Sequence, residues 1–99
     1  MKFSAAGGWW GSDWYNKVEL GYRYGFDGVE QLGWLGLDFD KAKKTLDETG
    51  VTSTAIIIQS ANQEYNSTIQ WSHGMVWEDT RKPFVEAFRE SVAAAKAMN

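Results

Sequence analysis

The sequence predicts an α/β fold in which three consecutive βα units place parallel strands in one sheet. Gly25 and Gly50 each follow an amphipathic stretch and precede a short apolar stretch that is typical of a buried strand. A glycine at such a place can adopt the left-handed conformation that closes a helix. The repeat divides one partial domain, residues 1–99, into units of residues 1–25, 26–50 and 51–99.

The first unit begins with a strand over residues 2–6, followed by a turn rich in glycine and tryptophan. We expect Ser12 to cap the helix that runs to Tyr24, because a serine side chain satisfies free backbone N–H groups at a helix start. Gly21 lies inside this helix, where it costs about 1 kcal/mol relative to alanine, so we expect it to let the helix approach the sheet closely. The apolar stripe of this helix comprises Trp14, Val18, Gly21 and Tyr22.

The second unit has a largely apolar strand over residues 28–32, in which Glu30 is the only charged residue. A charge inside such a strand is costly unless it is paired or used. Residues 33–36 form a loop, and Asp38 is expected to cap the second helix. The apolar positions of that helix that face inward are Phe39, Ala42 and Leu46.

The third unit has a strand over residues 54–58 that is apolar on both faces, as in a parallel sheet covered on two sides. Residues 60–79 show no convincing periodicity, and a loop of this length usually forms a lid or a binding loop. The third helix is expected to start at Asp79 or Thr80, with Pro83 tolerated in its first turn. Its predicted buried stripe is Phe84, Phe88, Val92 and Ala95.

The composition argues against several classes of partner. The net charge of −3, with no cluster of lysine and arginine, argues against nucleic acid and against an anionic membrane surface. The chain has no cysteine, and no apolar run is long enough to span a bilayer. Because a strand begins almost at the first residue, we expect no signal peptide and a cytoplasmic location.

Function in parallel α/β folds gathers at the carboxyl ends of the strands and in the loops that follow them. Glu30 lies at such an end and is the candidate catalytic residue, as a general base, a hydrogen-bond partner for a substrate hydroxyl, or a metal ligand. The alternative is a carboxylate paired with a basic residue inside the sheet. His73 could carry protons, bind a metal or contact substrate, although a histidine in a polar loop is more often not functional.

Aromatic and polar residues in the same loops are candidates for substrate binding. Indoles line sites for sugar-like ligands but also pack loops and cores. Gln59 is polar where an apolar strand ends, which fits a hydrogen bond to a ligand and equally fits exposure to solvent. The tryptophans in these positions are Trp9, Trp10, Trp34 and Trp71.

These residues give the chain a resemblance to the N-terminal portion of the hydroxypyruvate isomerase-like branch of the sugar isomerase/epimerase TIM barrels. The most specific match is Tyr-Gly-Phe-Asp-Gly-Val-Glu at residues 24–30. Weaker matches are Lys-Phe-Ser-Ala at residues 2–5, Gly-Trp at 33–34 and Asp-Phe-Asp at 38–40. Two longer stretches, residues 46–51 and 84–98, are similar to the ends of the family's second and third units.

The resemblance implies an eight-stranded barrel with a divalent metal near its axis, which assists proton transfer between adjacent carbons of a small hydroxycarbonyl compound. The family carries its metal carboxylates and catalytic glutamates on later strands, so no metal ligands and no cofactor are assigned to this chain alone. Glu30 and Trp34 match family positions that face the substrate. We therefore expect the N-terminal fragment of a sugar or hydroxy-keto acid isomerase or epimerase, inactive by itself.

Two other functions stay open. The first is a small α/β binding protein that self-associates, because three strands would leave two sheet edges and an apolar barrel-facing side uncovered. The second is a non-catalytic carbohydrate-binding module built on the tryptophans.

Overall fold

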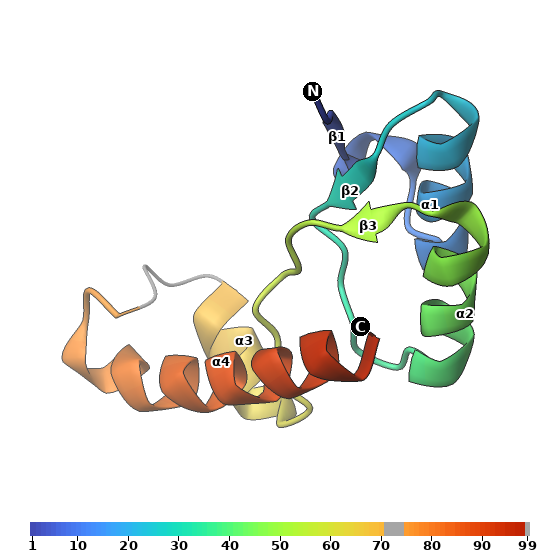
Figure 1. Ribbon diagram of the computed structural model, residues 1–99. Helices are drawn as coiled ribbons and strands as arrows, with labels where there is room; N and C mark the ends of the chain where they lie inside the picture. The colour runs from blue at the N-terminus through green and yellow to red at the C-terminus, as the bar shows by residue number, and fades with distance from the viewer. Residues whose placement is uncertain (71–74, 99) are drawn as a thin grey trace.

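The computed structural model describes residues 1–70 and 75–98 of the chain and contains one three-stranded parallel sheet with helices mainly on one side (Figure 1). The strands are β1 (Ser4–Ala6), β2 (Gly28–Glu30) and β3 (Thr52–Ser53), and they lie in the order β1-β2-β3. The parallel α/β arrangement predicted from the sequence is therefore confirmed.

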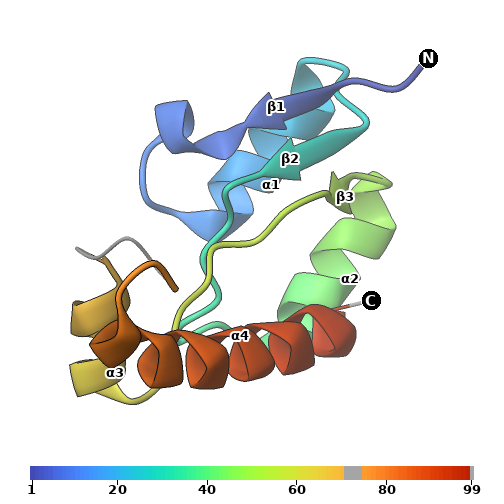
Figure 2. The same cartoon turned by 90° about the vertical axis from the view of Figure 1, so that its left-hand side faces the viewer.

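The pairing of β2 with β3 begins earlier than the sequence predicts. Thr52 lies opposite Gly28, whereas the strand was expected over residues 54–58. Beyond β3 the ladder continues through single contacts, with one isolated bridge between Leu32 and Ile56. The regular pairing ends there because the chain beyond β3 leaves the sheet and turns toward the last helix (Figure 2).

Alternation along the strands places Ala5, Val29 and Ser53 on one face of the sheet and Ser4, Gly28 and Thr52 on the other. Val29 is fully buried beneath the first helix. The opposite face carries the hydroxyls of Ser4 and Thr54, which lie 2.8 Å apart, and the strand period of two places Glu30 on that face as well. The expectation that the uncovered face is apolar is therefore wrong, because serine, threonine and glutamate occupy its positions.

Helix α1 (Trp14–Arg23) covers the sheet at close range. Its N-cap is Asp13, whose Oδ1 accepts the backbone N–H of Asn16 at 2.7 Å, so the expected cap by Ser12 is wrong by one residue. A Cβ on Gly21 would lie 2.5 Å from Cγ2 of Val29, which confirms the close approach expected at this glycine. The expected apolar stripe fails at Tyr22, which is 56% exposed.

Helix α2 (Phe39–Thr49) follows the sequence prediction closely. Oδ1 of Asp38 accepts the backbone N–H groups of Asp40 and Lys41, and Gly50 ends the helix with φ of 70°. Ala42 and Leu46 are buried as expected.

Helix α3 (Gln63–Gln70) lies inside the segment 60–79 that was predicted to be a loop, and that prediction is wrong for these residues. The helix starts at Asn62, whose Oδ1 accepts the backbone N–H of Tyr65 at 3.2 Å. Every residue of α3 keeps some exposure to solvent, and α3 packs against the last helix. The helix gives a weak apolar pattern in the sequence because two of its four half-buried residues, Asn66 and Thr68, are polar, and Tyr65 and Ile69 are the other two.

Helix α4 (Glu78–Met98) begins one residue before the expected start, so Pro83 lies in its second turn and not in its first. The expected buried stripe is also wrong, since Phe88 and Val92 are 50% and 38% exposed. The buried face consists of the smaller residues Ala87, Ser91 and Ala94, together with Met98 and Thr80. Small side chains allow this face to lie close to its neighbours.

The position of α4 differs from that of a third barrel helix. Instead of covering the sheet, it packs mainly against α2 and α3 (Figures 1 and 2). Its C-terminal half adds Ala94 and Met98 to the core. The rest of that core comes from α1, α2 and the strands with their exits: Trp14, Val18, Val29, Leu32, Trp34, Ala42, Leu46 and Val51. No helix within residues 1–70 and 75–98 is long and apolar enough to cross a bilayer.

Replacing Gly21 by alanine should destabilise the fold. Alanine gains about 1 kcal/mol of helix propensity, but its methyl group overlaps Val29, and overpacking of this kind costs about 1–3 kcal/mol. We expect G21A to lower the free energy of unfolding measured in urea. In a V29A background the same substitution should lower that free energy less, because the overlap with Val29 is removed. Asn16→Ala, at an exposed position of the same helix, is the control; a G21A chain as stable as this control would contradict the prediction.

Stability should fall in alkaline solution through Tyr15, a residue of α1 whose ring centroid lies 4.3 Å from Nζ of Lys41 in α2. Burial raises the pKa of Tyr15, and the negative charges of Asp38 and Asp13 raise that pKa further. Because the folded state then holds the phenol proton more tightly than the unfolded state, its contribution is complete below about pH 10 and is lost as pH rises beyond. Urea unfolding over this range should show the loss in the parent and in Tyr22→Phe, but less of it in Tyr15→Phe. Equal losses in the parent and Tyr15→Phe would contradict the prediction.

Candidate functional site

One buried hydroxyl joins the segments that follow β2 and β3 to helix α4. Oγ of Ser91, a residue only 1% exposed, accepts Nε1–H of Trp34 and the backbone N–H of Gln59, both at 3.0 Å. Its own hydrogen is donated to the carbonyl of Ala87 at 2.8 Å or to that of Gln59 at 3.2 Å. The sequence gives no local signal for this group of contacts, because the residues lie far apart in the chain.

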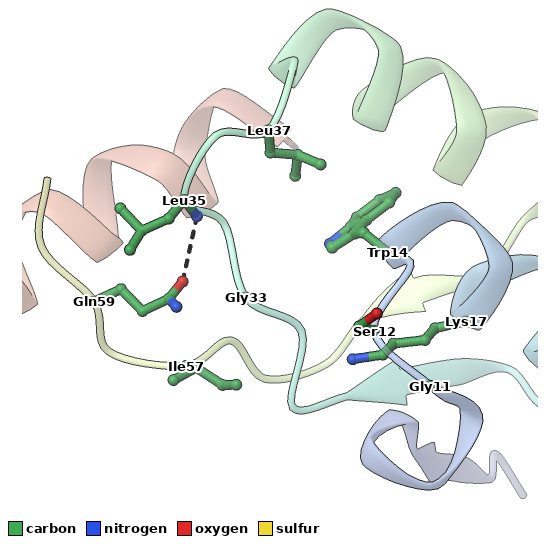
Figure 3. Close-up of a pocket in the computed structure, with 9 residues that line it drawn as sticks. All are labelled: Gly11, Ser12, Trp14, Lys17, Gly33, Leu35, Leu37, Ile57 and Gln59. Atoms are coloured by element: carbon green, nitrogen blue, oxygen red, sulfur yellow. Dashed lines mark hydrogen bonds between the residues drawn. The ribbon is translucent and has the colours of Figure 1, made fainter. Parts of the chain in front are cut away.

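The side chain of Gln59 ties the two strand exits directly to each other. Its Oε1 accepts the backbone N–H of Trp34 at 2.8 Å and that of Leu35 at 3.3 Å. Gly33 leaves room for this arrangement, since a Cβ there would lie 3.1 Å from the same oxygen. Gln59 is therefore bonded to backbone, and its amide nitrogen remains on the side of the neighbouring cavity (Figure 3).

That cavity has a volume of about 390 Å³ and lies where the three parallel strands end. Segments after β1, β2 and β3 all contribute to its wall, together with the first turn of α1 (Figure 3). Trp14 and Lys17 approach from α1, and Gln59 approaches from the opposite side of the Gly33 segment. The remaining lining residues are Gly11, Ser12, Leu35, Leu37 and Ile57.

The polar side chains of the cavity are mostly hydrogen-bond donors. They are the hydroxyl of Ser12, the indole of Trp14, the ammonium group of Lys17 and the amide of Gln59, and the described lining residues include no carboxylate. From the sequence, Trp14 is expected in the core-facing stripe of α1, and Lys17 carries no prediction. Their place in the first turn of a helix that follows a strand could have indicated a position at the carboxyl edge of the sheet.

Glu30 lies at the carboxyl end of the central strand, half-buried and opposite Ala6. It forms no ion pair with the described part of the chain, so the alternative of a carboxylate paired inside the sheet is not observed there. The next residue, Gln31, has φ of 61°, a left-handed conformation that is uncommon for residues other than glycine. Glu30 is not among the nine residues that line the cavity.

The tryptophans proposed for substrate binding do not gather at one place within the described residues. Trp9 is 87% exposed, whereas Trp34 is buried and its indole is bonded to Ser91. Trp10 packs against the rings of Tyr24 and Phe26, with centroids 6.1 and 6.0 Å away. Trp71 and His73 lie outside the described residues.

Residues 1–70 and 75–98 contain no group of three histidine, cysteine, aspartate or glutamate side chains close enough together to hold a metal ion. This is true of the carboxyl edge of the sheet and of the rest of these residues. Comparisons with known protein families, with curated proteins and with solved structures give no significant match to this chain.

Replacing Ser91 by alanine should weaken the junction of the two loops with α4. The change leaves two buried donors, on Trp34 and Gln59, without their acceptor. Each unsatisfied buried donor costs about 1–3 kcal/mol, so for two donors we expect a net loss of about 2–5 kcal/mol after a gain of about 0.5 kcal/mol in helix propensity. Urea unfolding measures the loss.

Ser67→Ala, at an exposed position of α3, is the matched control for the change of residue type. If S91A unfolds at the same urea concentration as S67A, the hydroxyl of Ser91 does not hold these segments together.

Proposed function

We propose that this chain forms the substrate-binding, N-terminal part of a metal-assisted isomerase or epimerase that acts on a small sugar or hydroxy-keto acid. One observation carries the proposal: the segments after all three parallel strands line a single cavity at the edge where Glu30 ends the central strand. In parallel α/β folds this edge is the usual place for ligands and for catalysis.

The cavity suits a small polar ligand. Its volume of about 390 Å³ lies within the range of small-molecule sites. Leu35, Leu37 and Ile57 supply an apolar wall, while Ser12 and Gln59 offer donors to hydroxyl or carbonyl oxygens. A hydroxycarbonyl compound carries both kinds of surface.

Glu30 ends the central strand at the same edge without lining the cavity, and in this proposal a ligand that extends from the cavity toward the strand end meets its carboxylate. A half-buried carboxylate at a strand end accepts a hydrogen bond from a substrate hydroxyl, or takes a proton from a carbon next to a carbonyl. The metal that the resemblance implies would polarise the carbonyl oxygen. The described residues do not make up a ligand set for it, so no step is assigned to a metal on this chain. The proposal therefore predicts binding without turnover.

The test is a titration of the purified chain with dihydroxyacetone, D-xylose, D-xylulose and hydroxypyruvate, followed through the indole and side-chain amide signals in ¹H–¹⁵N NMR spectra. At least one compound should shift the signals of Trp14 and Gln59, which border the cavity, and leave that of Trp77 unchanged, because Trp77 lies just before α4 and does not line the cavity. The absence of any shift with all four compounds would contradict the proposal, and so would isomerase turnover by this chain alone.

The role of Glu30 is tested separately by Glu30→Gln. Loss of a hydrogen bond to a charged group should weaken binding of the responding compound about tenfold. Glu48→Gln, on the exposed side of α2, is the matched control and should bind as the parent does. Equal affinity of E30Q and E48Q would remove Glu30 from the site.

A further inference from the structure

The indole of Trp14 is a buried donor without an acceptor. Trp14 is 8% exposed, and its Nε1 has no hydrogen-bond partner in the described residues. Buried N–H groups are nearly always bonded, so a native N–H without a protein acceptor indicates a missing partner. Figure 3 shows this nitrogen on the side of the ring that faces the Gly33 segment across the cavity.

Lys17, one helical turn further along α1, brings a positive charge to the same wall. Its stem lies over Gly7, where a Cβ would be 3.3 Å from Cδ of the lysine, and its side chain extends along the cavity (Figure 3). Its ammonium group has no ion pair with residues 1–70 and 75–98. A half-buried cation that no carboxylate neutralises attracts an anion more strongly than a fully solvated one.

The remaining groups around these two side chains favour a negative ligand. Ser12 adds a hydroxyl on the same side of the cavity, and Gln59 presents its amide nitrogen from the other side (Figure 3). The nearby carboxylate of Asp13 does not line the cavity, because it caps α1 through the backbone N–H of Asn16.

We propose that this cavity is an oxyanion site, in which a carboxylate or phosphate group of a small ligand lies between the Lys17 ammonium group, the Trp14 indole N–H and the Ser12 hydroxyl. The site rests on the proposed function only in sharing its cavity, and it specifies an anionic group on the ligand. Three donors, one of them charged, match the several acceptor lone pairs of such an oxygen group.

The test compares three probes at constant ionic strength: D-glycerate, inorganic phosphate and the uncharged glycerol. We expect glycerate or phosphate to shift the Trp14 indole signal, and glycerol to leave it unchanged. A response to glycerate alone identifies a carboxylate site, a response to phosphate alone identifies a phosphate site, and both support the proposal. Lys17→Gln should lower the affinity for the anion at least tenfold. The control is Lys82→Gln, at an exposed position of α4, which should leave that affinity unchanged.

Trp14→Phe identifies the indole signal of Trp14 by its loss and removes the N–H donor. Thermal unfolding of this variant shows whether its fold is intact. If W14F does not fold, K17Q alone tests the site. The oxyanion proposal is overturned if neither anion binds, if glycerol binds equally well, or if K17Q binds the anion as tightly as K82Q does. Binding of neutral sugars without either anion would overturn it and leave the isomerase proposal standing. Binding of an anion, with no response to any sugar or keto acid, would support the oxyanion site and contradict the isomerase proposal.

Discussion

The hydroxyl of Ser91 is the contact on which the arrangement of the site depends. A single buried oxygen receives a donor from each of the two strand exits, through Trp34 and Gln59, while its own hydrogen goes to a backbone carbonyl. The same two exits form much of the cavity wall. The shape of the cavity therefore follows from hydrogen bonds to a helix that does not line it, and α4 acts as a brace for the carboxyl edge of the sheet.

Local rules explain the parts of the fold that could be predicted from the sequence. Gly25 and Gly50 have φ of 78° and 70° at the ends of α1 and α2, and Asp38 caps α2 as expected. These features depend on a few neighbouring residues, and the conformational freedom of glycine or the reach of an aspartate side chain determines them. The close approach at Gly21 could also be predicted from the sequence, because a glycine inside an amphipathic helix implies a close neighbour.

The rest depends on contacts between distant residues. In α4 the aromatic positions Phe84 and Phe88 suggested a buried stripe, but the buried face carries the small side chains of Ala87 and Ser91, and Ser91 accepts the indole N–H of Trp34. The glutamate at the end of the central strand was found from its charge in an apolar run. The donors of the cavity were missed because a tryptophan and a lysine in an amphipathic helix resemble ordinary core and surface residues until their neighbours are known.

The hydroxyl groups on the uncovered face of the sheet bear on how such a chain behaves in water. Ser4 and Thr54 satisfy each other across the strands, and solvent can hydrate this face at little cost in free energy. Valine or leucine side chains on that face would promote nonspecific aggregation of the chain. The uncovered face of the three strands can thus stay in contact with water without promoting aggregation of the chain through that surface.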